Sequence, residues 1–191
     1  MLMQLLLQIF DWIFGFFTLA LLARVVLQAV RAPSRNPLSQ FVIAVTDWAV
    51  VPARRLIPSA YGLDLATLLL AWLTQAMFHG IVFGLLVSSA ALSPGAIAGV
   101  ALFAALAMLR LALYLLIGAV IISALLSWVN PYAPLAPVLN AIARPFLQPL
   151  QRLIPPIGGV DLSPLVLLLG LQVVLSLLTW MQRLVLPFFP L

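Results

Sequence analysis

The chain has 191 residues, of which 65% are hydrophobic and only 7% are charged, against roughly 25% charged residues in soluble domains. So few charges cannot keep a globular surface hydrated, which excludes a water-soluble fold. The net charge of +5 comes from arginines scattered between apolar stretches, not clustered on a polar face, so we expect no direct binding to nucleic acid. The absence of cysteine excludes disulfides, iron–sulfur clusters and thiolate metal sites.

Four apolar stretches are each long enough to cross a membrane as a helix of about 20 residues. In chain order they cover residues 9–30, 65–88, 96–129 and 165–186. The first has no basic segment before it and no small-residue cleavage site after it, so we interpret it as a permanent anchor. The predicted fold class is an all-α polytopic membrane protein with about four transmembrane helices.

The connection after the first stretch, residues 31–64, contains a predicted amphipathic helix. Its apolar residues recur at intervals of three and four and stop at Pro52: Leu38, Phe41, Val42, Val45, Trp48 and Ala49. The simpler interpretation is an interfacial helix that rests on lipid or on the bundle. The alternative is that Trp48, Phe146 and the nearby arginines form a docking face for a partner or an anionic lipid.

The second stretch contains the chain's single histidine, His79, which we expect well inside the bilayer. Because Thr74 and Gln75 lie one turn away, we interpret His79 as an interhelical hydrogen-bonding group in preference to a proton relay. Beside it runs a row of small residues: Ala76, Gly80, Gly84 and Ser88. This row predicts helix packing, either against a second row on the third stretch (Ala119, Ser123 and Ser127) or against a second copy of the chain.

The third stretch is too long for a simple span, because 34 residues make about 50 Å of helix against roughly 30 Å of hydrocarbon. Arg110 divides it into residues 96–109 and 111–129. We expect the first piece to be interfacial or re-entrant and the second to span. Asp11, Arg24 and Arg110 can each reach an interface by snorkelling.

The second connection, residues 130–161, repeats the amphipathic pattern over residues 135–147. Its apolar positions are Val138, Leu139, Ile142 and Phe146, and Pro145 is placed to kink or end the helix. The two connections hold most of the arginines: Arg31, Arg35, Arg54, Arg55, Arg144 and Arg152. The positive-inside rule therefore predicts that both connections are cytoplasmic and both termini periplasmic, with Arg183 as the contrary charge.

An internal repeat relates the two halves of the chain. The segments PARRLIPSAYGLDL (residues 52–65) and PLQRLIPPIGGVDL (residues 149–162) are identical at eight of fourteen positions. Each is preceded by an Asn-Pro pair where we expect a helix to end, namely Asn36 with Pro37 and Asn130 with Pro131. We infer two parallel units, residues 1–95 and 96–191, related by a pseudo-two-fold axis along the membrane normal.

The duplicated Asn-Pro pair, Pro-x-x-Arg-Leu-Ile-Pro segment and Gly-x-Asp-Leu segment resemble the signature of the YggT family, also called YlmG, over essentially the whole chain. The resemblance implies a bacterial inner-membrane protein without an assigned reaction. It also implies association with division-gene neighbourhoods, nucleoid or organelle distribution, cytochrome maturation in plastids, or osmotic and potassium homeostasis. The chain departs from strict duplication at Arg24, which has no charged counterpart near Ser123.

The repeated residues are candidate structural or binding groups. They are Pro52, Arg55, Pro58, Gly62 and Asp64 in the first unit, and Pro149, Arg152, Pro155, Gly159 and Asp161 in the second. In each unit the arginine precedes the aspartate by nine residues, which predicts a repeated ion pair, and each aspartate can cap the span that follows. The alternative is that the two turns bind a lipid headgroup or line an ion path.

The composition disfavours catalysis, because the chain has one histidine, no glutamate, no lysine and four aspartates near predicted span ends. We therefore expect a non-enzymatic protein without cofactor or metal. The favoured function is a scaffold or assembly factor whose cytoplasmic turns contact membrane lipids, a membrane-protein partner or a second copy of the chain. The alternative is a small channel or transport accessory in osmotic or potassium balance, which would need oligomerisation to form a pore.

Overall fold

A computed structural model of the chain describes residues 1–32, 36–58, 64–86, 94–154 and 161–185. These residues form α-helices in the order α1 (Leu2–Ala29), α2 (Pro37–Leu56), α3 (Leu65–Leu86), α4 (Pro94–Val129), α5 (Ala136–Leu153) and α6 (Ser163–Val185). Four of them, α1, α3, α4 and α6, are long and apolar enough to cross a membrane. The prediction of an all-α polytopic membrane protein is confirmed.

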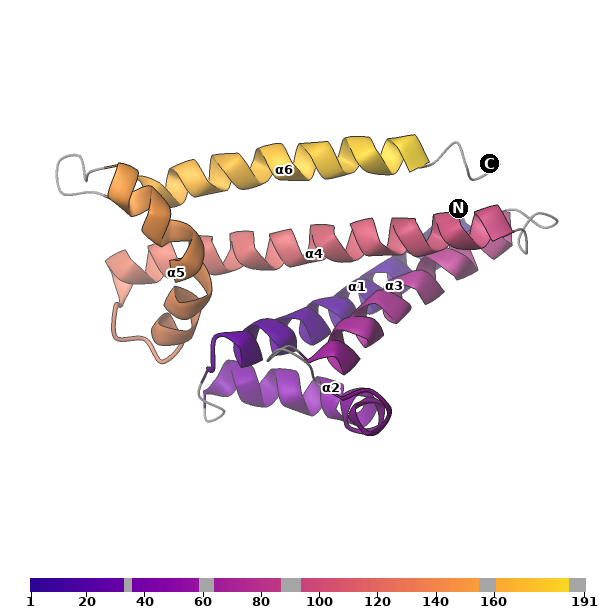
Figure 1. Cartoon of the computed structure of the whole chain (residues 1–191), viewed down its shortest axis with the longest axis horizontal. Coiled ribbons are helices and arrows are strands. Elements are labelled where there is room, and N and C mark those ends of the chain that lie inside the picture. Colours follow the sequence, from indigo (N-terminus) through magenta and orange to yellow (C-terminus); the bar gives the residue numbers. More distant parts are fainter. Residues whose placement is uncertain (33–35, 59–63, 87–93, 155–160, 186–191) are drawn as a thin grey trace.

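Each unit consists of two long helices with a shorter helix packed across their ends (Figure 1). In the first unit α1 packs against α3 and contacts α2. In the second, α4 packs against α6 and contacts α5. The units meet mainly where α4 contacts α1 and α3. Both short helices lie at the ends of α1 and α4 that are away from the amino terminus, so the two connections share one side of the molecule.

The buried core is built around the two short helices. One cluster joins Leu27 and Val42 of the first unit to Val120, Val138 and Ile142 of the second. A second cluster holds α2 and α3 against α1: Leu21, Leu22, Val50 and Ala71. Burial of these side chains away from water stabilises α2 and α5, which are too polar to enter the bilayer as spans.

The third apolar stretch is one continuous helix, α4, and the predicted division at Arg110 is wrong. Within α4 no proline occurs after Pro94, so no residue of this type interrupts its hydrogen-bond ladder. The Arg110 guanidinium donates to the side-chain oxygen of Gln182 on α6, which satisfies part of its hydrogen-bonding capacity inside the helix bundle. With 36 residues, α4 is about 54 Å long.

Prolines do not end the two amphipathic helices. The α2 helix continues through Pro52 to Leu56, and α5 continues through Pro145 and Pro149 to Leu153. All three proline residues are exposed, so water or headgroups can hydrogen-bond the carbonyl groups that a helical proline leaves free. The prediction that Pro52 breaks the first helix is therefore wrong, because a lost hydrogen bond is tolerated at the surface. Of the two alternatives for Pro145, a kink or a helix end, the end is excluded.

The two Asn-Pro pairs have different roles. Asn36 begins a helix, because its Oδ1 accepts a 2.8 Å hydrogen bond from the Ser39 backbone N–H while Pro37 occupies the first turn of α2. The prediction that a helix ends there is wrong. Asn130 directly follows the last residue of α4 and accepts from the Tyr132 backbone N–H at 3.2 Å, so the second pair does mark a helix end.

Candidate functional site

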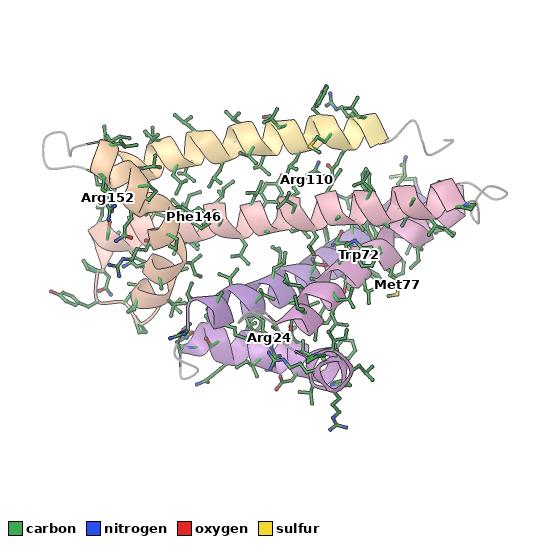
Figure 2. The ribbon with its side chains drawn as sticks, in the orientation of Figure 1. Arg24, Trp72, Met77, Arg110, Phe146 and Arg152 are labelled. Carbon is green, nitrogen blue, oxygen red and sulfur yellow. The ribbon has the colours of Figure 1, made fainter. Side chains whose placement is uncertain are left out.

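Arg24 is the centre of the polar network that joins α1 to α2 (Figure 2). Arg24 is only 9% exposed. One guanidinium nitrogen donates to Thr46 Oγ1 at 2.8 Å and lies 2.8 Å from Asp47 Oδ1. Thr46 in turn donates to the Val42 carbonyl at 2.6 Å. Arg24 therefore has a charged partner on α2, which reduces the free-energy cost of burying it.

Asp64 forms the second polar centre, at the start of α3. It accepts from Arg54 Nε at 2.9 Å, from a second Arg54 nitrogen, and from the Thr67 hydroxyl and backbone N–H. Arg54 also donates to Gln28 Oε1 on α1 at 3.1 Å. The Asp64–Arg54 pair thus links three helices of the first unit, and Asp64 caps α3, as the sequence predicts for this aspartate.

The environment of Asp64 favours its ionised form. The residue is 2% exposed. Burial acts to raise the pKa of its carboxyl, but the hydrogen bonds and charge of Arg54 and the hydrogen bonds of Thr67 outweigh burial and lower the pKa below its usual value. Asp64 is therefore a charged group at neutral pH, with its hydrogen-bonding capacity directed to the protein.

The arginine that pairs with Asp64 is Arg54, so the predicted pairing with Arg55 is wrong by one residue. Arg55 lies on the exposed face of α2. Adjacent helical residues point about 100° apart, and the duplicated sequence did not show which side of α2 faces the bundle.

The second unit repeats the linkage between the short helix and the aspartate, with a neutral glutamine in place of the arginine. Gln151, which aligns with Arg54, donates to Asp161 Oδ2 at 2.8 Å, and the Ser163 backbone N–H donates to Asp161 Oδ1 at 2.8 Å. Burial acts to raise the pKa of the Asp161 carboxyl, but the hydrogen bonds from Ser163 and Gln151 lower it overall. Arg152 is exposed (Figure 2), and its predicted ion pair with Asp161 is not formed.

The remaining repeated residues lie at a segment end, in a turn or outside the described residues. Pro58 is exposed at the end of a described segment, and Pro131 lies in the turn after α4. The predicted candidates that fall outside the described residues are Ser88, Gly62, Pro155 and Gly159.

The small-residue row of α3 packs partly within the chain. A Cβ atom at Gly80 would lie 3.9 Å from Val100 Cγ1 of α4, whereas one at Gly84 would meet no atom of the described residues within 4 Å. Trp72 Nε1 also donates to the Ala101 carbonyl of α4 at 3.1 Å. The row thus meets the amino-terminal half of α4.

The second small-residue row does not meet the first. Ala119 belongs to the core shared with α5, and Ser123 donates to Asn140 Oδ1 of α5. The predicted contact between the two rows is therefore wrong, because the carboxyl-terminal half of α4 packs on the amphipathic helix of its own unit.

The outward faces of α2 and α5 carry exposed aromatic groups. Trp48 is 71% exposed although its ring stacks on Phe17 at 5.3 Å between centroids, and Phe41 and Phe146 are also exposed. The inward face of α2 consists of Ser39, Val42, Thr46 and Val50. The predicted apolar stripe of α2 is therefore turned partly outward, whereas Val138, Leu139 and Ile142 of α5 are buried as predicted.

Between the two arginine networks lies a cavity of about 210 Å³. Its polar lining comes from Arg24, Arg54, Gln28 and Ser39. The sequence did not identify Arg54, Gln28, Thr46 and Thr67 as members of these networks. Among the described residues, no group of three His, Asp or Glu side chains could hold a metal ion.

Comparison with known proteins identifies relatives across most of the chain. The profile of the CCB3/YggT family matches residues 3–86 and 102–182, one region in each unit. An uncharacterized protein of Pseudomonas aeruginosa is 38% identical over 83% of this chain and 80% of its own. One from the proC 3′ region of Vibrio alginolyticus is 37% identical over 84% and 85%, and the uncharacterized protein YggT of Escherichia coli K12 is 33% identical over 83% and 80%. No solved structure matches the chain significantly.

Proposed function

Because the chain belongs to the CCB3/YggT family and has four helices able to span a membrane, we propose that it is a non-catalytic scaffold or assembly factor of the bacterial inner membrane. In this proposal α2 and α5 lie at the cytoplasmic surface and both termini are periplasmic. The outward faces of α2 and α5 contact a partner membrane protein.

The exposed aromatic residues of these helices carry the proposal. Trp48 on α2 and Phe146 on α5 lie on helices that also carry the exposed arginines Arg55, Arg144 and Arg152. Tryptophan and arginine are enriched among the residues that dominate binding at protein interfaces. Since both helices sit on one side of the molecule, they can present a joint surface to one partner.

The helices that carry this surface are held firmly to the bundle. The Arg24 and Arg54 networks tie α2 to α1 and α3, and the hydrogen bond between Ser123 and Asn140 ties α5 to α4. A surface whose backbone is fixed loses less conformational entropy on binding than a mobile one. The polar networks therefore support a docking role even though they make no contact with the partner themselves.

Site-specific photo-crosslinking in living cells tests the proposal. A photoreactive phenylalanine analogue in place of Phe41 or Phe146 should give a discrete protein adduct, and the same analogue at lipid-facing Leu177 of α6 should not. The Phe41 adduct should be lost in a Trp48→Ala background and retained in a Val51→Ala background, because Val51 is exposed on α2 but lacks the aromatic anchor.

Two outcomes would contradict the scaffold proposal. Adducts with lipid alone at both positions would mean that the aromatic residues only anchor α2 and α5 in the interface. Potassium flux through liposomes that contain the purified protein would favour the alternative of a transport accessory in osmotic or potassium balance.

A further inference from the structure

A second, larger cavity lies between the two units, among the spans. Its volume is about 420 Å³, within the range of about 300–1,000 Å³ that is typical of small-molecule sites. Helices α1, α3, α4 and α6 all contribute to its wall. Its lining includes Asp11, Gln75, His79, Arg110 and Gln182, a concentration of polar groups that is unusual between membrane spans.

Within the described part of the chain, the charged groups that line this cavity form no ion pairs. In the part of the chain that the structure describes, the ion pairs are Arg24 with Asp47 and Arg54 with Asp64. Arg110, labelled between α4 and α6 in Figure 2, instead donates to the neutral amide of Gln182. Asp11, on the α1 wall of the same cavity, forms no ion pair with any described residue either. A positive and a negative group thus line one cavity without contacting each other.

His79 adds an unsatisfied polar atom to the same site. Its Nε2 is buried and has no hydrogen-bond partner, while the ring packs edge-on against Phe103 at 4.7 Å between centroids. A buried polar atom without a partner costs about 1–3 kcal/mol, and His79 is among the residues that line the cavity. In the tautomer that carries its proton on Nε2, His79 can donate to a ligand oxygen.

An apolar cavity continues from the polar one along the seam between α1 and α4. It has a volume of about 290 Å³, and the two cavities share Leu19 and Tyr114 in their walls. Its other walls are apolar and come from both units, including Leu27, Gly118 and Ile142. The polar cavity lies nearer the amino-terminal ends of α1 and α4, and the apolar one lies nearer α5. The seam is therefore polar toward the side of the termini and apolar toward α5. This polarity fits an amphiphile whose headgroup lies toward the termini and whose tail lies toward α5.

We propose that this seam is a binding site for a zwitterionic aminophospholipid. The phosphate lies on Arg110 and His79, the ammonium group lies on Asp11, and one acyl chain occupies the apolar cavity. A purely anionic headgroup would neutralise Arg110 but would face repulsion from Asp11, whereas a headgroup with both charges satisfies both residues. The site is separate from the docking surface of α2 and α5 and does not depend on that proposed role.

Native mass spectrometry of the purified chain, after detergent delipidation and addition of defined lipids, tests the site. Phosphatidylethanolamine should bind more tightly than phosphatidylglycerol, which lacks the ammonium group, and than phosphatidylcholine, whose quaternary nitrogen has no N–H donors. Arg110→Gln should weaken phosphatidylethanolamine binding about tenfold, the effect expected for one lost charged hydrogen bond. Arg183→Gln, an exposed arginine of α6, should leave binding unchanged.

Two further variants separate headgroup recognition from misfolding. Asp11 is exposed, so Asp11→Asn should fold normally and should abolish the preference for phosphatidylethanolamine over phosphatidylglycerol. A side chain at Gly118 meets open space, so Gly118→Leu should fill the apolar cavity and weaken binding of diacyl lipids while leaving binding of glycerophosphoethanolamine, the headgroup without chains, unchanged. Equal binding of the three lipids to the unmodified chain, or an unchanged preference in Asp11→Asn, would overturn the proposal.

Discussion

At the scale of single residues, Arg54 is the group whose loss should most weaken the first unit. Arg54→Ala leaves the Asp64 carboxylate buried without its charged donor, which should lower the free energy of unfolding by about 1 kcal/mol. This value is the lower end of the range of about 1–3 kcal/mol for a buried group that loses its partner, and we choose it because the Arg54 side chain is 42% exposed. Thermal unfolding in detergent should report the loss as a lower Tm.

Two substitutions serve as controls for Arg54. Arg55→Ala removes the neighbouring exposed arginine and should change stability by less than about 0.5 kcal/mol. Arg54→Gln should recover part of the loss, because Gln151 makes the equivalent hydrogen bond to Asp161 in the second unit. Equal destabilisation by Arg54→Ala and Arg55→Ala would show that net charge, and not the bond to Asp64, is what matters.

The lowered pKa of Asp64 predicts an acid-sensitive contribution to stability. Because the pKa in the folded chain is below the ordinary value of 3.8, the ionised carboxylate stabilises the fold fully above that value, and the contribution is lost as the pH falls through the folded pKa. Tm should therefore fall between neutral pH and pH 3 by more in the unmodified chain than in Asp64→Asn. Asp161, whose pKa is also lowered, should preserve part of the acid sensitivity in that variant. A parallel decline in both proteins would contradict this assignment.

Residue roles were predictable where they depend on position along the chain. An aspartate just before an apolar span predicts a cap, and Asp64 forms one. The partner of Asp64 was not predictable, because Arg54 and Arg55 are the same residue type and differ only in the direction in which their side chains leave the helix. Arg24 and Thr46 meet across 22 residues, and the cavity residues Asp11, His79 and Arg110 come from three helices. No local pattern in the sequence relates such positions.

At the scale of helices, hydropathy and length located the spans but not their continuity or their contacts. Four apolar stretches correspond to four helices, whereas the charge of Arg110 predicts a boundary that α4 does not have. The face of α2 was also misjudged, because the hydroxyl groups of Ser39 and Thr46 are satisfied by Asn36 and Arg24 and can therefore be buried. Polar side chains that have hydrogen-bond partners inside the protein can be buried, so hydropathy alone does not identify them as buried.

The contact of α3 with α4 predicts opposite outcomes for two glycines of one helix. Gly80→Ile should lower Tm, because atoms beyond Cβ would enter the space next to Val100 and separate the helices. Gly84→Ile should leave the Tm of the monomer unchanged, since its Cβ meets open space. Size-exclusion chromatography with light scattering should accompany the measurement. A change of mass in Gly84→Ile would show that the outward part of the row joins two copies of the chain.

At the scale of the whole molecule, the two units place their arginine-bearing connections on one side, and the positive-inside rule predicts that this side is cytoplasmic. The chain has no cysteine, so single cysteines can report sidedness without background. Arg55→Cys on α2, Arg152→Cys on α5 and Gly95→Cys at the start of α4 are all at exposed positions. In intact cells whose outer membrane has been permeabilised, a membrane-impermeant maleimide should label only position 95. After disruption of the inner membrane it should label all three.

Labelling of positions 55 and 152 from opposite sides would contradict the parallel arrangement itself. Labelling of both from outside would retain the arrangement but reverse its orientation, and the proposed docking surface would then face the periplasm.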